Sequence, residues 1–224
     1  MYLVLFIFIL PRDDKKIIYS SDIRGFFSSF FAIFFIRNIF HCHSHMNGFI
    51  SKLISAFSAN IIVPSKEVGK LNFKENNKMH VIYNGLFDDV AKEVNLKNNK
   101  IYKFLWVGMI TPQKGLHSIL EPYANIKKNR SSSLTIYGDF YGKDAKAYES
   151  YLKNEINRLN IEKNIFFKGW REEIPYEDYD ILIFSSIKKG ELHLGSYSLN
   201  IASSEALPTT IIEAIGNGLR GSGD

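Results

Sequence analysis

The sequence places two carboxylates around the predicted start of a helix. Glu205 and Glu213 stand eight positions apart, in a stretch that reads as a loop followed by a helix ending near Gly216. Pro208 suits the first helical position, and the isoleucines that follow can anchor one helix face in a core while polar groups stay outside. Carboxylates in this arrangement suit the hydroxyl groups of a sugar or a ribose.

The first turn of this helix suits an anion. The backbone N–H groups around Leu207, Thr209 and Thr210 lie where a helix has no carbonyl partners for them. The positive end of the helix dipole strengthens their attraction for a phosphate. A structural alternative stays open, because Thr210 and Glu213 also fit a capping box, in which the carboxylate only satisfies a backbone donor.

Glycine follows three consecutive predicted strands. These glycines are Gly108, Gly138 and Gly169. In open α/β sheets the loops after the strands lie at the carboxyl edge, where ligands bind at the switch in strand order. We therefore predict a ligand site at this edge.

Length and composition indicate a globular protein. The chain has 224 residues, of which 46% are hydrophobic, and this excludes a generally disordered chain. The formal charge of +5 comes from scattered lysines without a dense basic block, so no nucleic-acid partner is expected. The single cysteine, Cys42, excludes an internal disulfide and indicates a reducing compartment, by default the cytoplasm.

Two apolar segments lie near the amino terminus. Residues 1–10 are almost wholly apolar but stop at Pro11, well short of the roughly 20 residues of a spanning helix. They also lack the basic start and cleavage site of a signal peptide. Residues 25–40 carry phenylalanines at intervals of three to four, which predicts a helix that is buried or lies at a membrane surface.

Short β-rich segments alternate with helical patterns along the whole chain. The predicted strands are residues 16–20, 38–43, 60–64, 79–83, 102–107, 134–137, 165–168 and 181–184. The predicted helices are residues 25–40, 48–57, 65–71, 114–127, 145–159, 172–179 and the one after Pro208. This alternation predicts an α/β fold with parallel sheets and crossover helices. A polar, Asn- and Lys-rich linker at residues 88–100 divides it into two domains, residues 1–90 and 91–224.

Five segments, in order, resemble the retaining group 1 (family four) glycosyltransferases. They are residues 107–115, 134–138, 165–169, 180–186 and 205–213, the last holding the Glu-x7-Glu motif. Residues 60–65 and 81–85 also resemble the end of that family's amino-terminal domain. The resemblance implies a GT-B architecture of two Rossmann-like domains with parallel sheets. The amino-terminal domain is expected to be incomplete, and the carboxyl-terminal nucleotide-sugar-binding domain to lack its last elements.

The resemblance also implies an activity. A sugar would pass from a UDP-sugar or GDP-sugar to a saccharide or lipid-linked acceptor with retention, in cell-surface polysaccharide or lipopolysaccharide synthesis. No cofactor or essential metal is implied, and the enzyme would work in the cytoplasm, in peripheral contact with the inner membrane surface. Two alternatives stay open: a non-catalytic nucleotide-binding remnant, and a membrane-surface or partner-binding module built on the phenylalanine-rich segment.

The resemblance assigns a role to each candidate residue of the donor site. Glu205 would contact hydroxyls of the donor sugar, and Glu213 the ribose. Lys114 would neutralise the pyrophosphate as the glycosidic bond breaks. The backbone around three residues would face the diphosphate: Leu207, Thr209 and Thr210.

Other candidate residues would line the cleft. Gly108 and Gly138 would let the backbone approach the ligand, although ending a strand is reason enough for a glycine. Trp170 lies where the family often holds the base, and packing is the alternative role. His43 would lie near the acceptor. A metal site made with the histidines at positions 41 and 45 is not expected, because zinc needs a fourth ligand and the sequence has no second cluster.

The sequence departs from the family pattern at three places. Met109 replaces an arginine that grips the diphosphate, and Ser20 and Ser21 stand in the neighbourhood of a family histidine. Residues 187–204 form an insertion beside the proposed site. We expect this insertion to alter the pocket or to break it.

Overall fold

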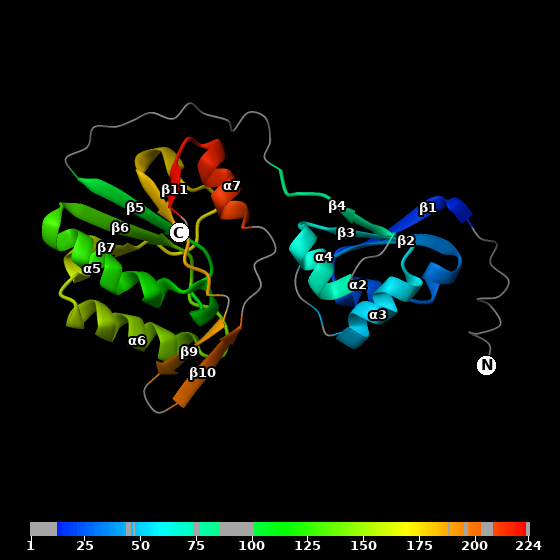
Figure 1. The fold of residues 1–224 in the computed structure, drawn as a ribbon, viewed down its shortest axis with the longest axis horizontal. Coiled ribbons are helices and arrows are strands. Elements are labelled where there is room, and N and C mark those ends of the chain that lie inside the picture. Colours follow the sequence, from blue (N-terminus) through cyan, green and yellow to red (C-terminus); the bar gives the residue numbers. More distant parts are fainter. Residues whose placement is uncertain are drawn as a thin grey trace. The chain divides into compact units, whose positions relative to one another are not determined.

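The chain forms two compact units. The computed structural model describes residues 13–43, 46, 48–73, 77–85, 101–187, 189–194, 197–202 and 208–222. Unit 1 comes from the residues up to Asn84, and unit 2 from Gly85 to Ser203 and from Pro208 onward (Figure 1). The predicted domain boundary after residue 90 and the predicted linker at residues 88–100 lie outside the described residues.

Unit 1 is built on a four-stranded parallel sheet with the order β1-β2-β3-β4. The strands are β1 (Asp13–Ser20), β2 (Ile36–His41), β3 (Asn60–Val63) and β4 (Met79–Val81). The helices are α2 (Ile23–Ser28), α3 (Gly48–Phe57) and α4 (Lys66–Phe73), with a 3-10 turn, η1 (Ala32–Phe34), before β2. Phe26 of α2 and Ile54 of α3 pack with Phe40 and Ile61 of the strands in one fully enclosed core.

The phenylalanine-rich segment is not one helix, so the predicted helix at residues 25–40 is wrong. α2 ends at Ser28, because the hydroxyl and the N–H of Ser29 both donate to the carbonyl oxygen of Gly25 and close the helix. From Ile36 the chain pairs with β1 and buries Asn38 and Phe40, which is the alternation of a half-buried strand. Sheet pairing therefore overrides the helical spacing.

Unit 2 is built on a five-stranded parallel sheet with the order β11-β8-β5-β6-β7. The strands are β5 (Tyr102–Val107), β6 (Ser132–Tyr137), β7 (Ile165–Phe167), β8 (Ile181–Ile183) and β11 (Arg220–Ser222). β6 pairs with one edge of β5 and β8 with the other, so the strand order reverses at β5. The carboxyl end of β5 is therefore the point at which an open α/β sheet binds ligands.

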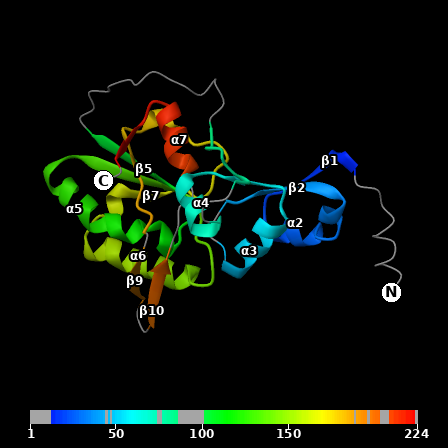
Figure 2. The same ribbon diagram turned by 45° about the vertical axis from the view of Figure 1, so that its right-hand side comes forward.

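Helices cover both faces of this sheet (Figures 1 and 2). They are α5 (Leu120–Asn129) and α6 (Ala145–Arg158) on one face, and α7 (Thr209–Gly216) on the other. Successive residues of β5 alternate between the two cores: Phe104 packs with α5 and α6, and Leu105 packs with α7. None of the described helices is both long and apolar enough to cross a membrane.

Two predicted helices of unit 2 differ from the expectation, one in where its α-helix begins and ends and the other in being a single turn. The one at residues 114–127 begins with the 3-10 turns η3 (Pro112–Lys114) and η4 (Leu116–Ile119), because Gly115 between them has φ +71° and ends the first turn. The one at residues 172–179 is only the 3-10 turn η6 (Tyr176–Asp178), since Pro175 cannot donate a helical hydrogen bond. A further 3-10 turn, η5 (Glu162–Asn164), precedes β7.

The predicted insertion forms a hairpin of its own. β9 (Lys189–Leu194) and β10 (Tyr197–Ala202) pair antiparallel. Leu192, Leu194 and Ile201 are buried in the core that also holds α5 and α6. The alternating pattern of one apolar and one polar face is that of a two-stranded ribbon packed against a domain.

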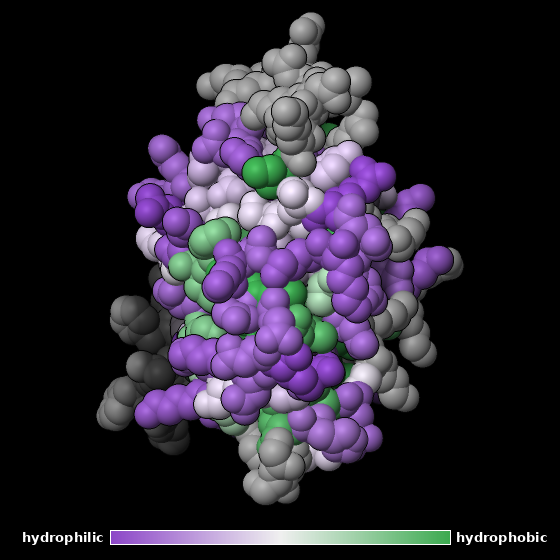
Figure 3. All heavy atoms as spheres, turned by 90° about the vertical axis from the view of Figure 1, so that its left-hand side faces the viewer, coloured by the Kyte–Doolittle hydropathy of each residue, from purple (hydrophilic) through white to green (hydrophobic). Residues whose placement is uncertain are grey.

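The surface of unit 2 where β5 and β6 begin is mainly hydrophilic. Figure 3 views the molecule from this end and shows small, separate hydrophobic areas among polar side chains. Scattered areas of this size are ordinary on a protein surface. Within the described residues, this end of the sheet therefore has no surface feature that indicates a ligand site, in contrast to the carboxyl edge.

Candidate functional site

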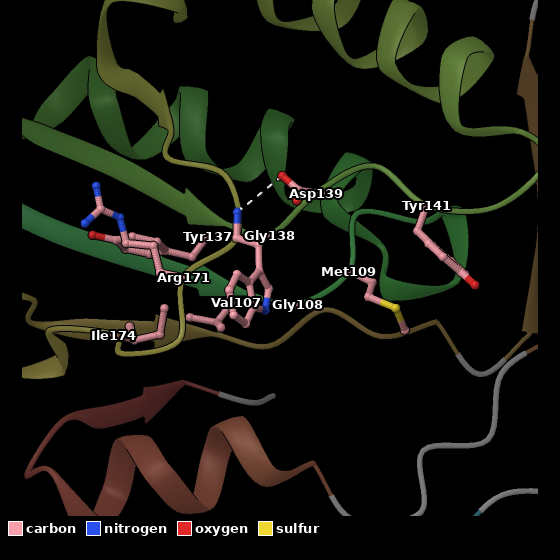
Figure 4. A pocket seen from close by; sticks show the side chains of 10 residues that line it. Val107, Gly108, Met109, Tyr137, Gly138, Asp139, Tyr141, Arg171 and Ile174 are labelled. Atoms are coloured by element: carbon pink, nitrogen blue, oxygen red, sulfur yellow. Dashed lines mark hydrogen bonds between the residues drawn. The ribbon is translucent and has the colours of Figure 1, made fainter.

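A pocket of about 420 Å³ lies at the carboxyl ends of the strands of unit 2 (Figure 4). Its lining residues are the last residues of β5 and β6 and residues of the loops after β5, β6 and β7: Val107, Gly108, Met109, Tyr137, Gly138, Asp139, Tyr141, Trp170, Arg171 and Ile174. This is the edge at which the glycine-ended strands predict a ligand site. Of the candidate residues named from the sequence, Gly108, Gly138 and Trp170 come together here.

Bare backbone forms part of the pocket. Gly138 has φ +134°, and a side chain at this position would overlap the carbonyl oxygen of Gly108. The N–H of Gly138 donates to the carbonyl oxygen of Gly169 at 2.9 Å, which ties the loop after β6 to the loop after β7. Only glycine fits such a close approach, and the missing side chain leaves room for a ligand.

Aromatic and charged side chains line the rest of the pocket. Trp170 is 69% exposed and Tyr141 is 67% exposed, so neither ring is used for core packing. The backbone N–H of Trp170 donates to Oδ1 of Asp139 at 3.2 Å (Figure 4). Asp139 and Arg171 add an exposed anion and an exposed cation. An open aromatic face beside polar groups suits a flat heterocyclic ring.

A buried tyrosine holds the carboxylate of Glu213. The hydroxyl of Tyr176 donates to Oε2 of Glu213 at 2.7 Å. Tyr176 is 4% exposed, and its burial, followed by this hydrogen bond, raises its pKa well above the usual range of tyrosine. Tyr176 therefore remains a proton donor at neutral pH.

The capping-box alternative for Glu213 is wrong. α7 begins at Thr209, so Glu213 is its fifth residue and not its third. The N-cap residue is Pro208 and not Thr210, and proline has no N–H for a carboxylate to satisfy. Pro208 also stands one position earlier than the sequence suggested, with ψ 106° outside the helical range. The carboxylate is therefore not used as a helix cap.

The start of α7 has no side-chain cap. Among the described residues, no side chain accepts a hydrogen bond at the N-cap. The N–H of Ile211 donates to the carbonyl oxygen of Pro208 at 3.2 Å, whereas the N–H groups of Thr209 and Thr210 stand at positions that have no intrahelical acceptor. The anion site expected here stays a prediction. Glu205 and Leu207, assigned to the same site, lie outside the described residues.

Lys114 lies at the end of η3, in the turn that follows β5, and does not line the described pocket. The hydroxyl of Ser185 donates to the carbonyl oxygen of Lys114 at 2.9 Å, and the indole N–H of Trp106 donates to the same hydroxyl oxygen at 2.9 Å. A side chain at Gly115 would overlap the carbonyl oxygen of Ser185. The backbone that carries Lys114 is therefore fastened to the ends of β5 and β8.

The hairpin supports this turn. The N–H of Ile187 donates to the carbonyl oxygen of Gln113 at 2.9 Å, one residue before Lys114. No residue of β9 or β10 that the structure describes lines the pocket. The expectation that the insertion alters or breaks the proposed site stays a prediction, because Glu205 and Leu207 of that site lie outside the described residues.

His43 belongs to unit 1. It lines a second pocket, of about 360 Å³, together with Ser21, Asp22, Arg24 and Cys42 among others. The ring centroids of His41 and His43 lie 4.0 Å apart, and burial, followed by the charge of His43, lowers the pKa of His41. Within the described ranges, which leave out His45, the acidic, histidine and cysteine residues form no group of three that could hold a metal ion.

Sequence reasoning missed several polar and aromatic residues of the site. Asp139 and Arg171 lie one and two positions beyond a strand-ending glycine, so inspection of the residues just after each strand end would have found them. Tyr176 gives no such signal, because it reaches Glu213 from 37 positions away in the chain. Such a contact exists only in the folded protein.

Comparisons with known proteins agree with this architecture. Residues 87–219 match the family model described as glycosyl transferases group 1. No curated protein sequence matches the chain. Among solved structures, Alr3699/HepE from Anabaena, in complex with UDP and glucose, aligns with a TM-score of 0.73 at 18% identity over 92% of this chain and 58% of its own.

Two further structures are similar. A glycosyltransferase from Rickettsia africae aligns with a TM-score of 0.70 at 18% identity, over 92% of this chain and 56% of its own. Sucrose-phosphate synthase from Thermosynechococcus elongatus aligns with a TM-score of 0.69 at 14% identity, over 92% of this chain and 55% of its own. The chain thus spans less than two thirds of the length of these proteins.

The likeness to these structures confirms the predicted fold class, GT-B with Rossmann-like units and parallel sheets, of which this chain holds a part. The family match covers more than half of the chain and contains the whole pocket of unit 2. It also contains Lys114, η6 and α7. The chain belongs to the glycosyl transferases group 1 family.

Proposed function

We propose that the pocket of unit 2 binds the nucleoside-diphosphate part of a sugar donor, a UDP-sugar or a GDP-sugar. One observation carries the proposal: the open face of Trp170 and the bare backbone at Gly138 meet at the strand-order reversal of the sheet. Similar structures support it, since HepE was solved with UDP-glucose and with UDP, and TarM from S. aureus with UDP.

The donor would lie along the carboxyl edge from base to sugar. The base stacks on Trp170, beside the guanidinium of Arg171. The ribose hydroxyls donate to the carboxylate of Glu213, and Glu205 takes the hydroxyls of the donor sugar. The diphosphate lies at the N–H groups that start α7, around Leu207, Thr209 and Thr210.

The whole protein would transfer this sugar with retention. As the glycosidic bond breaks, negative charge develops on the departing diphosphate, and the ammonium group of Lys114 and the positive end of α7 stabilise it. Met109 stands where the family has a second cation, so Lys114 carries a larger share of this task. These fixed charges take the place of a metal ion, and no cofactor is needed.

The acceptor would be a saccharide or a lipid-linked saccharide, bound near His43 in the pocket of unit 1. The names of similar structures support this class of acceptor: WaaB is a lipopolysaccharide outer core galactosyltransferase, and TarM was solved with α-GlcNAc-glycerol. The product would be a cell-surface polysaccharide or a lipopolysaccharide, made on the cytoplasmic face of the membrane.

Contact with an anionic membrane surface is a second proposed function. Unit 1 exposes Phe31 by 60%, Phe34 by 52% and Phe49 by 70%, and Arg24 and Arg37 are also exposed. Aromatic rings and arginines together suit the interface of an anionic bilayer. In a liposome flotation assay, Phe31→Asp should abolish binding, whereas Phe166→Asp in unit 2 should not. Equal binding by both variants would contradict this contact.

A transfer assay tests the proposed activity. The purified protein, treated with a chelator, is incubated with UDP- and GDP-sugars and with saccharide and lipid-linked acceptors, and products are identified by mass spectrometry and NMR. We expect one donor to be used, with its anomeric configuration kept and without added metal. Nucleotide binding without transfer would favour the alternative of a non-catalytic remnant.

A further inference from the structure

We propose that Tyr176 is a positioning residue for the donor: its hydroxyl holds Oε2 of Glu213 so that Oε1 faces the ribose hydroxyls. The inference rests on the proposed function, which places the ribose at Glu213. It adds a residue to the site that no sequence motif identifies.

The position of the Tyr176 hydroxyl is fixed by packing. Its ring lies in the core that also contains Leu105, Leu182, Ala214 and Leu219. Ala214 follows Glu213 directly in α7, so the tyrosine and the helix that carries the carboxylate share one rigid core. The 2.7 Å hydrogen bond therefore joins a fixed donor to a half-buried, otherwise flexible side chain.

The hydrogen bond restricts Glu213 without using up its binding capacity. A glutamate side chain samples several rotamers in solution, and holding one of them before the ligand arrives removes an entropic cost from binding. An ionised carboxylate has about four acceptor positions on its two oxygens, and Tyr176 occupies one of them. Because Tyr176 stays protonated at neutral pH, it serves as a permanent donor to this carboxylate.

The segment around Tyr176 also contributes to the pocket wall. Ile174, two positions before it, lines the pocket, and the N–H of Tyr176 donates to the carbonyl oxygen of Ile174 at 2.9 Å. Tyr137 belongs both to the pocket and to the core around Tyr176. One short segment thus orders the wall of the pocket and the carboxylate expected to bind the ribose.

A neighbouring tyrosine supplies a matched control. Tyr179 donates its hydroxyl to the hydroxyl of Tyr137 at 3.1 Å and packs against the same core. Tyr179→Phe therefore removes one hydroxyl from the same segment, as Tyr176→Phe does, together with its hydrogen bonds to Tyr137 and Thr135, but leaves the bond to Glu213 in place.

The test compares UDP or GDP, whichever binds, with its 2′,3′-dideoxy analogue. We expect Tyr176→Phe to weaken binding of the natural nucleotide about five- to tenfold, which is the usual effect of losing one hydrogen bond to a charged group. Binding of the dideoxy analogue should weaken by less than about twofold. The ratio of the dissociation constant of the dideoxy analogue to that of the natural nucleotide measures the contribution of the ribose hydroxyls. Tyr179→Phe should leave this ratio unchanged. Glu213→Gln should lower this ratio by itself, and adding Tyr176→Phe to it should change the ratio no further.

Each other outcome has a defined meaning. If Tyr176→Phe weakens both nucleotides equally, the tyrosine acts through packing alone and the inference is overturned. If the unmodified protein binds both nucleotides equally, the ribose does not use Glu213, and the inference fails while the donor pocket stands. If no nucleotide binds, the proposed function fails and the inference with it. Should Tyr176→Phe not fold, Glu213→Gln alone still decides whether the ribose uses this carboxylate.

Discussion

At the scale of single residues, the site depends on glycines at positions where the neighbouring backbone leaves no room for a side chain. Gly138 lies against the carbonyl oxygen of Gly108, and Gly115 lies against that of Ser185. Each close approach draws together two loops at the carboxyl edge of one sheet. Gly138, directly after β6, is thus needed for more than ending the strand, and Gly115, between η3 and η4, has the same role. Both allow two loops to come into contact.

Gly138→Ala should destabilise the protein and distort the pocket. The methyl group would overlap the oxygen of Gly108 at a φ of +134°, and we expect the free energy of unfolding to fall by about 2–5 kcal/mol in urea denaturation. Gly142→Ala is the control, since its φ is also positive, at +96°, but nothing lies within 4 Å. It should cost only about 1–2 kcal/mol. Equal losses of stability in the two variants would show that the carbonyl oxygen of Gly108 does not restrict the side chain at position 138.

At the scale of elements, the hairpin β9–β10 acts as a brace for the turn that carries Lys114. Its apolar face is buried in the core of unit 2, and the segment leading into it bonds to the carbonyl oxygen of Gln113. The hairpin, which is an insertion relative to the family pattern, is therefore an integral part of the folded domain.

Loss of the hairpin's packing should destabilise unit 2. Ile201 is 2% exposed, so Ile201→Ala should lower the free energy of unfolding by about 2–4 kcal/mol, through lost burial and the cavity left behind. Asn200→Ala, on the exposed face of the same strand, should change it by less than about 0.5 kcal/mol. A small effect of Ile201→Ala in chemical denaturation would mean that the hairpin is only loosely attached.

The contact between η4 and α6 should make stability depend on pH. The hydroxyl of Tyr148 lies 2.8 Å from Nδ1 of His117, and burial lowers the pKa of His117. The unfolded chain therefore takes up a proton near the usual histidine pKa of about 6.5, at a higher pH than the folded chain does, so stability falls as pH drops below that value. His117→Gln should flatten the pH dependence of unfolding between pH 7.5 and 5.5. If the variant shows the same pH dependence of unfolding as the unmodified protein, other titrating groups cause that dependence.

Much of the architecture follows from the sequence, and the misses have physical causes. Strands such as β5 and β6 were predicted because their runs are short, β-rich and followed by glycine, and the structure buries these runs on both faces. The helix expected at residues 25–40 ends at Ser28. Its phenylalanine spacing outweighed the strand also predicted at residues 38–43, which the structure forms as β2. The hairpin and the bond from Tyr176 to Glu213 were also missed. The strands of the hairpin are neighbours in the chain, but residues 187–204 were interpreted only as an insertion and not as strands. The bond from Tyr176 to Glu213 joins segments that are distant in the chain.

At the scale of the whole molecule, the described site belongs to unit 2 and lies wholly inside the matched family segment. The pocket holds backbone at Gly138 and an exposed ring at Trp170. The carboxylate of Glu213 does not line it but is tied by Tyr176 to the segment of Ile174, which does. In the proposed pose, Trp170 takes the base and Glu213 the ribose of one nucleoside diphosphate, and Gly138 leaves room for the ligand. Our central claim is therefore that the pocket binds this ligand.

Calorimetric titration with UDP and GDP tests that claim most directly. We expect saturable binding of one of them to one site per chain, weakened about tenfold or more by Trp170→Ala, the loss measured for base stacking on an aromatic ring. Phe166→Ala, which removes an exposed ring from β7 outside the pocket, should leave the affinity within about twofold. No binding by the folded protein, or equal binding by the Trp170 variant, would contradict the account.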